Sequence, residues 1–176
     1  MIHVVVTGSE CTGKTTLAEA LAQQYQTAWV PEFIRDFVNE RGASLTFEDV
    51  DSVARGQIAL EDEYASLGPR LLIHDTDLLS AVVYNHHYYG KCPAWIEDAC
   101  TKRAADLYLL AGVDVPWVAD GLLRDRSEQR EEMQEFFRNA LESRRLLFTE
   151  VQGTPEERLA VAVPAIDSLI ARLKQE

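Results

Sequence analysis

The sequence has few basic residues, few cysteines and no long hydrophobic run. Its 17 Lys and Arg residues, against 29 Asp and Glu residues, give a formal net charge of −12. A protein that binds a nucleic-acid backbone needs a basic face, so we expect no nucleic-acid partner. A local phosphate site is not excluded, because backbone N–H groups and a few cations can build one.

Only three cysteines are present, and no two of them have CxxC spacing. An odd number without paired spacing favours reduced thiols and a cytoplasmic protein. No apolar run approaches the ~20 residues that a membrane-spanning helix requires, so we expect no membrane partner. The apolar run at residues 2–6 is also too short for a signal peptide.

The 176 residues alternate between short apolar runs and longer amphipathic segments. The expected strands cover residues 2–7, 27–30, 70–75, 106–111 and 146–151. The expected helices cover about 14–25, 32–41, 46–67, 76–87, 94–104, 127–145 and the segment from 154 onward. This alternation predicts an α/β fold in one domain over residues 1–176, with a five-stranded parallel sheet flanked by helices.

Two of the expected helices begin with a capping-box pattern. Thr46 is followed three residues later by Asp49, and Thr154 is followed by Pro155 and then by Glu157. In such a box, each of the two side chains accepts a hydrogen bond from the backbone N–H of the other residue.

Ligands of parallel α/β sheets lie at the carboxyl ends of the strands, so that edge is where a site is expected.

The first expected strand leads into the octapeptide GSECTGKT, which fits GxxxxGK[ST] at every fixed position. The two glycines let the backbone N–H groups point inward around phosphate oxygens. Lys14 can reach the β- and γ-phosphates, and the Thr15 hydroxyl can hold Mg²⁺. We therefore predict ATP and Mg²⁺ as cofactors. The predicted nucleotide-binding residues are Gly8, Ser9, Glu10, Cys11, Thr12, Gly13, Lys14, Thr15 and Thr16.

The third expected strand ends in two acidic residues, Asp75 and Asp77. In phosphoryl transfer, a carboxylate at such a strand end holds Mg²⁺ opposite the loop hydroxyl, so Asp75 is the first metal candidate beside Thr15. For Asp77 the sequence leaves two interpretations open. It either caps the following helix, or it binds the water shell of the metal or a substrate hydroxyl.

An acid and an arginine follow the second expected strand, at Glu32 and Arg35. A kinase that phosphorylates a hydroxyl needs a carboxylate to orient it, and Glu32 is placed for that role. Arg35 lies on the same helix face and can meet the transferring phosphate or a charged part of the substrate. A first-turn acid with an ordinary surface pair is the alternative, and the sequence does not decide between them.

Three arginines lie close together after residue 120, at Arg124, Arg126 and Arg130. Phosphoryl transfer spreads negative charge over the equatorial oxygens, and arginines of a lid can neutralise it. We expect a lid over about 115–130, with Arg124 and Arg126 as catalytic candidates and Arg130 as the weakest. The alternative is a solvated charged loop that leads into a helix.

Aromatic residues gather in the sequence YNHHYY of residues 84–89, and Trp29 lies after the first helix. They can line a pocket for a flat ring. They can also belong to the core and rim of a helix end, which is the more common case.

Together these segments resemble the ribosylnicotinamide kinase domain of NadR-type NAD-biosynthesis proteins, from residue 2 to about 172. The ordered set GSExxGKT, ExxRxF, DTD and WVxDG carries the resemblance. It implies a P-loop NTPase of the nucleoside and nucleotide kinase type. The implied reaction moves the γ-phosphate of ATP to the 5′-hydroxyl of nicotinamide riboside, which gives NMN.

The resemblance also implies roles for individual residues. Residues 8–15 bind ATP and magnesium, Glu32 and Arg35 face the riboside, and Asp75 and Asp77 serve metal and substrate. Asp120 and Gly121 begin the lid that carries Arg124. NadR-type proteins carry an adenylyltransferase domain before the kinase, and some have a DNA-binding segment. This sequence shows neither, so we expect it neither to make NAD from NMN nor to bind operator DNA.

Two other functions stay open. One is a kinase of another nucleoside or small hydroxyl metabolite, because the same parts serve many acceptors. The other is a regulatory P-loop ATPase or switch that signals to a partner protein. Glu32 and Arg35, together with the arginine lid, favour a kinase with ATP and a small nucleoside-like substrate as its partners. The sequence carries no signal of the oligomeric state.

Overall fold

A single sheet of five parallel strands forms the centre of the computed structural model, which describes residues 1–115 and 129–175. Its strand order is β2-β3-β1-β4-β5, and every neighbouring pair is parallel. The strands are β1 (Ile2–Thr7), β2 (Trp29–Val30), β3 (Leu71–Asp75), β4 (Leu107–Ala111) and β5 (Phe148–Val151). The predicted α/β fold with a five-stranded parallel sheet is confirmed.

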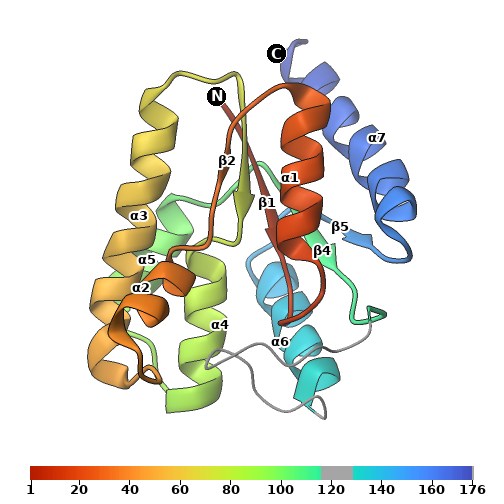
Figure 1. Cartoon of the computed structure of the whole chain (residues 1–176). Coiled ribbons are helices and arrows are strands. Elements are labelled where there is room, and N and C mark those ends of the chain that lie inside the picture. The colour runs from red at the N-terminus through yellow and green to blue at the C-terminus, as the bar shows by residue number, and fades with distance from the viewer. Residues whose placement is uncertain (116–128, 176) are drawn as a thin grey trace.

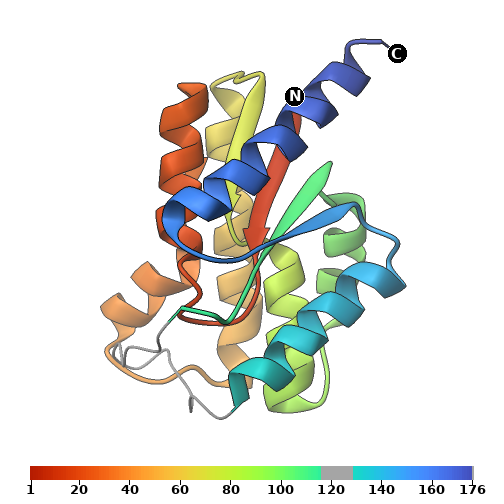
Figure 2. The ribbon, with the colours of Figure 1, turned by 90° about the vertical axis from the view of Figure 1, so that its right-hand side faces the viewer.

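Helices cover both faces of the sheet (Figure 1 and Figure 2). They are α1 (Lys14–Tyr25), α2 (Phe33–Arg41), α3 (Val50–Ser66), α4 (Leu78–Tyr89), α5 (Ala94–Lys102), α6 (Arg130–Ser143) and α7 (Pro155–Leu173), with a 3₁₀ turn η1 (Phe47–Asp49) before α3. Helices α1 and α7 pack on one face, and α3, α4, α5 and α6 pack on the other. Helix α2 lies against α3, near the carboxyl ends of the strands (Figure 1).

Alternation of side chains along β1 explains the two layers. Val4 and Val6 join the core with α1 and α7, whereas Val5 joins the core on the opposite face. Strand β4 repeats the pattern, with Leu109 on the first side and Tyr108 on the second. Successive side chains of a strand point to opposite faces, so a strand buried on both faces must be a continuous apolar run.

Several element boundaries differ from the sequence-based expectation, and for β2 and α4 the structure shows the reason. Strand β2 begins at Trp29 and not at residue 27, because the Thr27 N–H donates to the Ala22 carbonyl at 2.9 Å and closes the end of α1. Helix α4 begins at Leu78 and not at residue 76, because Thr76 has a left-handed φ of 67° that turns the chain after β3.

Both predicted capping boxes are present. The Thr46 N–H donates to Asp49 Oδ2 at 2.8 Å, before η1. The Thr154 N–H donates to Glu157 Oε2 at 2.7 Å, at the start of α7. Within the described ranges, no helix combines the length and the apolar character that crossing a membrane would need.

Candidate active site

The phosphate loop joins β1 to α1, and its two fixed glycines adopt backbone angles that favour glycine. Gly8 has φ 127° and Gly13 has φ 77°. A Cβ atom at Gly8 would lie 2.9 Å from the carbonyl oxygen of Ala111, at the end of β4. The loop therefore needs glycine at residue 8 both for its angle and for its close approach to β4.

Lys14, the first residue of α1, lies inside this loop. Its side chain is buried, and Nζ donates to the Ser9 carbonyl at 2.7 Å, where the Thr12 hydroxyl also donates at 2.8 Å. Burial lowers the pKa of Lys14, while the nearby carboxylates of Glu32 and Asp75 oppose that shift. An ammonium group has three N–H donors, so Lys14 keeps donors for phosphate oxygens.

Thr15 and Asp75 meet at the edge between β1 and β3. The Thr15 hydroxyl donates to Asp75 Oδ2 at 2.5 Å. The other oxygen, Oδ1, is buried and has no hydrogen-bond partner among the described residues. Burial raises the pKa of Asp75, and the charge of Glu32 raises it further. An orphaned carboxylate oxygen beside a hydroxyl fits Mg²⁺ or a water bound to it, because Mg²⁺ takes oxygen ligands and keeps several waters.

No group of three or more His, Cys, Asp or Glu side chains within residues 1–115 and 129–175 is arranged to hold a metal ion. A magnesium ion at Thr15 and Asp75 would therefore take its remaining ligands from phosphate oxygens and water. That is the usual arrangement where Mg²⁺ accompanies a nucleotide.

Asp77 is the N-cap of α4. Its Oδ1 accepts from the Leu79 N–H at 3.0 Å, and its Oδ2 accepts from the Tyr108 hydroxyl at 2.8 Å. Burial raises the pKa of Asp77 to about 6. Of the two interpretations that the sequence left open, the geometry favours the cap because both oxygens are engaged. A role for Asp77 toward metal or substrate stays a prediction.

Glu32 and Arg35 form a pair at the start of α2. Arg35 Nε donates to Glu32 Oε2 at 2.8 Å, and the Glu32 side chain is 17% exposed. The backbone N–H of Phe33 donates to Gln57 Oε1 of α3 at 3.0 Å, which fixes the first turn of α2. The ion pair that the alternative interpretation named is present, and both of its side chains line the cavity beside the phosphate loop, so a role toward the substrate stays a prediction.

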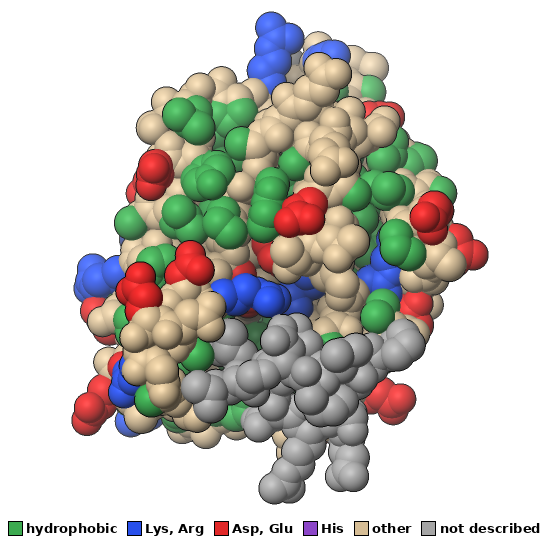
Figure 3. Space-filling model, viewed as in Figure 1, with side chains coloured by type: hydrophobic (Ala, Val, Ile, Leu, Met, Phe, Trp, Pro, Cys, Tyr) green, Lys and Arg blue, Asp and Glu red, His purple; other side chains and the backbone are tan. Residues whose placement is uncertain are grey.

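That cavity has a volume of about 660 Å³ and is lined by the phosphate loop, α2, α3 and α4. Tyr84 and Tyr88 of α4 line it, with their rings stacked at a centroid distance of 5.9 Å. Tyr89 lines it as well, whereas His86 pairs with Glu97 at 2.6 Å. Basic side chains lie across the centre of the face that Figure 3 presents.

The lid residues are only partly described. Asp120, Gly121, Arg124 and Arg126 lie outside the described residues, so their roles stay predictions. Arg130 is described and buried, and its Nη2 donates to the carbonyls of Cys11 at 3.2 Å and Val115 at 3.0 Å. The weakest lid candidate thus contacts the backbone of the phosphate loop.

Sequence reasoning missed two residues that hold this loop. Gln134 of α6 accepts from the Ser9 N–H at 3.2 Å, and Arg158 of α7 donates to the Thr12 carbonyl at 2.5 Å. Both are buried, and each continues the apolar stripe of its helix. Gln134 lies three residues before Phe137 in α6, and Arg158 lies four residues before Ala162 in α7. A polar residue in register with an apolar stripe was the available signal.

A family model described as AAA domain matches residues 3–158, which is most of the chain. The chain belongs to the AAA domain family. Over 154 residues, or 85% of the chain, it is 29% identical to the trifunctional NAD biosynthesis/regulator protein NadR of Escherichia coli (strain K12). Over 123 residues it is 29% identical to the protein of the same name from Salmonella typhimurium (strain LT2). The matched regions span 38% and 30% of these relatives, and the resemblance to NadR-type proteins is confirmed.

Solved structures of the same fold include NadR in complex with NR. That structure has a TM-score of 0.71 at 21% identity, over 92% of this chain and 48% of that one. Thymidylate kinase from Ehrlichia chaffeensis has a TM-score of 0.64 at 15% identity, over 96% of this chain and 98% of that one. Deoxyadenosine kinase from M. mycoides has a TM-score of 0.60 at 11% identity, over 95% and 100%. This AAA domain protein therefore has the P-loop fold of nucleoside and nucleotide kinases.

The metal assignment predicts the effect of Asp75→Asn. This variant keeps the volume but removes the charge opposite Thr15, so Mg²⁺-dependent turnover should fall on the order of 100-fold or more. The measurement is ATP turnover as a function of Mg²⁺ concentration. The matched control is Asp51→Asn, because Asp51 lies in an exposed ion pair with Arg55. Superimposable Mg²⁺ curves for Asp75→Asn and wild type would place the metal elsewhere.

Proposed function

We propose that the chain is an ATP-dependent kinase that phosphorylates nicotinamide riboside to NMN in NAD salvage. The observation that carries this proposal is the cavity, which has Lys14 of the phosphate loop and the Glu32–Arg35 pair in one lining. Its volume of about 660 Å³ is ample for a nucleoside. A phosphate donor site and a hydroxyl-orienting acid that open on one space are what transfer to a small alcohol requires.

The charge of the cavity favours an acceptor without a phosphate group. Its described lining holds four carboxylates and two cations; these are Glu10, Glu32, Asp49 and Asp77, with Lys14 and Arg35. A nucleoside monophosphate would need basic groups for its own phosphate. The cationic ring of nicotinamide riboside suits this balance, and Tyr84 and Tyr88 add aromatic rings to the lining for a cation–π contact.

Each residue then has a defined role in the transfer. Lys14 binds the β- and γ-phosphates and neutralises charge on the transferring group. Glu32 accepts a hydrogen bond from the 5′-hydroxyl and orients it toward the γ-phosphorus. Because the transition state is loose, early proton removal contributes little and orientation dominates. Magnesium, when bound by Thr15 and Asp75, supplies further neutralisation of the phosphate oxygens.

A kinase of another nucleoside or small hydroxyl metabolite is the second candidate, since a deoxyadenosine kinase has the same fold. A regulatory ATPase or switch is the third. The cavity argues against a switch, because a switch needs loops that sense the γ-phosphate and has no need of an acceptor space beside Glu32.

The proposal predicts the outcome of an acceptor screen. Purified protein with ATP and Mg²⁺ is offered nicotinamide riboside, adenosine, cytidine, uridine, deoxythymidine and deoxythymidine monophosphate, and products are separated by chromatography. Nicotinamide riboside should give NMN with the highest kcat/KM, and the monophosphate should not react.

Turnover of another nucleoside without turnover of nicotinamide riboside would refute the specificity and leave the kinase assignment standing. If no small acceptor reacts while a partner protein binds only the ATP-loaded form, the function is that of a switch.

The role of Glu32 gives a separate prediction. Glu32→Gln should lower kcat on the order of 10²-fold, because a misoriented hydroxyl loses several kcal/mol of positioning. The dissociation constant of ATP should barely change. Steady-state kinetics and calorimetric ATP binding measure the two effects, with Glu40→Gln on the exposed face of α2 as the matched control. An unchanged kcat, or a parallel loss of ATP affinity, would contradict the assigned role.

A further inference from the structure

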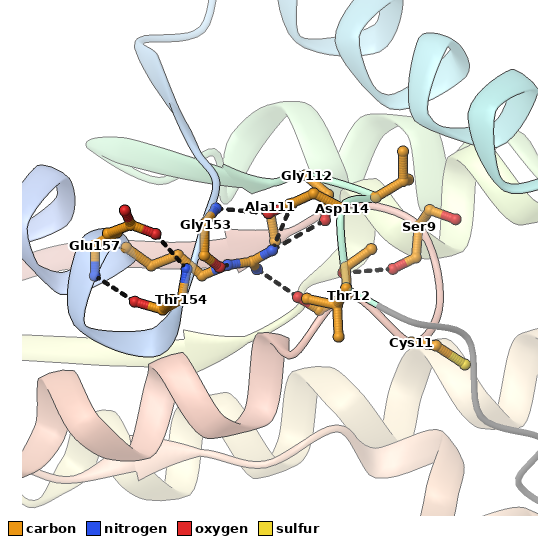
Figure 4. Close-up of polar contacts among 12 residues, drawn as sticks. Ser9, Cys11, Thr12, Ala111, Gly112, Asp114, Gly153, Thr154 and Glu157 are labelled. Carbon is orange, nitrogen blue, oxygen red and sulfur yellow. Dashed lines mark hydrogen bonds and ion pairs between the residues drawn. The ribbon is translucent and has the colours of Figure 1, made fainter.

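Arg158, near the start of α7, is a buried cation that the proposed reaction does not use. Its side chain is 4% exposed. Nη1 donates to the Thr12 carbonyl at 2.5 Å, and Nε donates to the Gly153 carbonyl at 3.0 Å. Nη2 donates to the Gly112 carbonyl at 3.2 Å and to Asp114 Oδ1 at 2.7 Å. Figure 4 shows these partners converging on one place.

The partners come from three separate segments of the chain. Thr12 belongs to the phosphate loop, Gly112 and Asp114 follow β4, and Gly153 lies between β5 and α7. Asp114 also accepts from the Gly153 N–H through Oδ2 at 2.6 Å, so its carboxylate is held on both sides. The guanidinium has five N–H donors for these four bonds, whereas a lysine has three donors, all on a single nitrogen.

The bond to Thr12 fixes the direction of the next N–H group. A trans peptide is planar, and its C=O and N–H point to opposite sides. Because the Thr12 carbonyl is directed at Arg158, the N–H of Gly13 is directed away from it. Arg130 acts on the preceding peptide in the same way, since its Nη2 donates to the Cys11 carbonyl. Arg130 of α6 and Arg158 of α7 thus each bind one of two successive backbone carbonyls of the loop, those of Cys11 and Thr12.

We propose that Arg158 is a positioning residue of the phosphate loop, which fixes the Thr12–Gly13 peptide with the Gly13 N–H directed at the phosphates before ATP binds. Asp114 orients the guanidinium for this task. Preorganised donors bind charge more tightly because little ordering remains when the ligand arrives. The proposal rests on ATP as the ligand of the loop and is independent of the acceptor.

A purely structural role is the competing explanation. Arg158 lies in register with Ala162 and Ile166 on the buried stripe of α7, so it also docks this helix on the sheet. Docking alone would lower the melting temperature and leave the nucleotide affinity of the folded protein unchanged. Positioning of the loop predicts a loss of affinity in protein that remains folded.

The test compares Arg158→Lys, Arg158→Met and Asp114→Asn with the control Arg138→Met. Arg138 of α6 is a matched control because it also binds carboxylates, Glu135 and Glu150, but away from the loop. Calorimetry measures binding of AMP-PNP with Mg²⁺, and of inorganic tripolyphosphate, well below the melting temperature of each variant. Neither ligand requires an acceptor, so a failed acceptor screen does not affect this result.

Arg158→Lys should weaken AMP-PNP binding about tenfold, the loss expected for one charge-assisted hydrogen bond. Tripolyphosphate should lose affinity by a similar factor, because the loop contacts phosphate groups. Asp114→Asn should lose less, since three carbonyl acceptors of Arg158 remain. Arg138→Met should bind as wild type does, and the KM for the acceptor at saturating ATP should be unchanged in all variants.

Wild-type affinity in Arg158→Lys together with a lowered melting temperature would overturn the proposal in favour of docking alone. If Arg158→Met does not fold, Arg158→Lys decides the matter, because it retains the charge and most of the side-chain volume. Absence of AMP-PNP binding in the wild-type protein would overturn the proposal together with the ATP assignment on which it rests.

Discussion

Parallel pairing of β1 with β3 and β4 is the constraint on which the site depends. In this register Val6 lies beside both Asp75 and Leu109, so three strands end at one edge of the sheet. The phosphate loop after β1 therefore meets Asp75, 60 residues later than Thr15, at hydrogen-bond distance. The segment after β4 begins at the same edge, and there the Gly112 carbonyl accepts a hydrogen bond from Arg158 of α7. A one-residue slip of β3 would turn Asp75 to the opposite face of the sheet and separate it from Thr15.

The features that could be predicted from the sequence are local ones. The strands, the glycine loop and both capping boxes depend on residues within a few positions of one another. The location of Asp75 at the site could be predicted because Asp75 ends an apolar strand. The shape of the cavity could not be predicted, because it arises from packing between helices. For example, the ring of Phe33 in α2 packs directly against Gly56 of α3. A Cβ atom at residue 56 would lie only 2.0 Å from that ring.

Three buried polar residues that contact the site were also not predicted, because each lies on the apolar stripe of its helix. Gln57 of α3, Gln134 of α6 and Arg158 of α7 are buried among hydrophobic neighbours on their helices. A hydropathy pattern treats each one as an interruption of the stripe. In the structure each one bonds to a backbone group of the site, at Phe33, Ser9 or Thr12. Burying such a group is costly unless it is fully bonded, so its presence in register indicates a specific partner.

In the proposed reaction, the acceptor hydroxyl and the γ-phosphate meet in one cavity between Lys14 and Glu32. A crystal structure of the protein with AMP-PNP, Mg²⁺ and nicotinamide riboside would locate both groups. We expect the riboside beside Tyr84, with its 5′-hydroxyl hydrogen-bonded to Glu32 and facing a γ-phosphate bound by Lys14. A riboside bound outside this cavity, or a γ-phosphate directed away from Glu32, would contradict it.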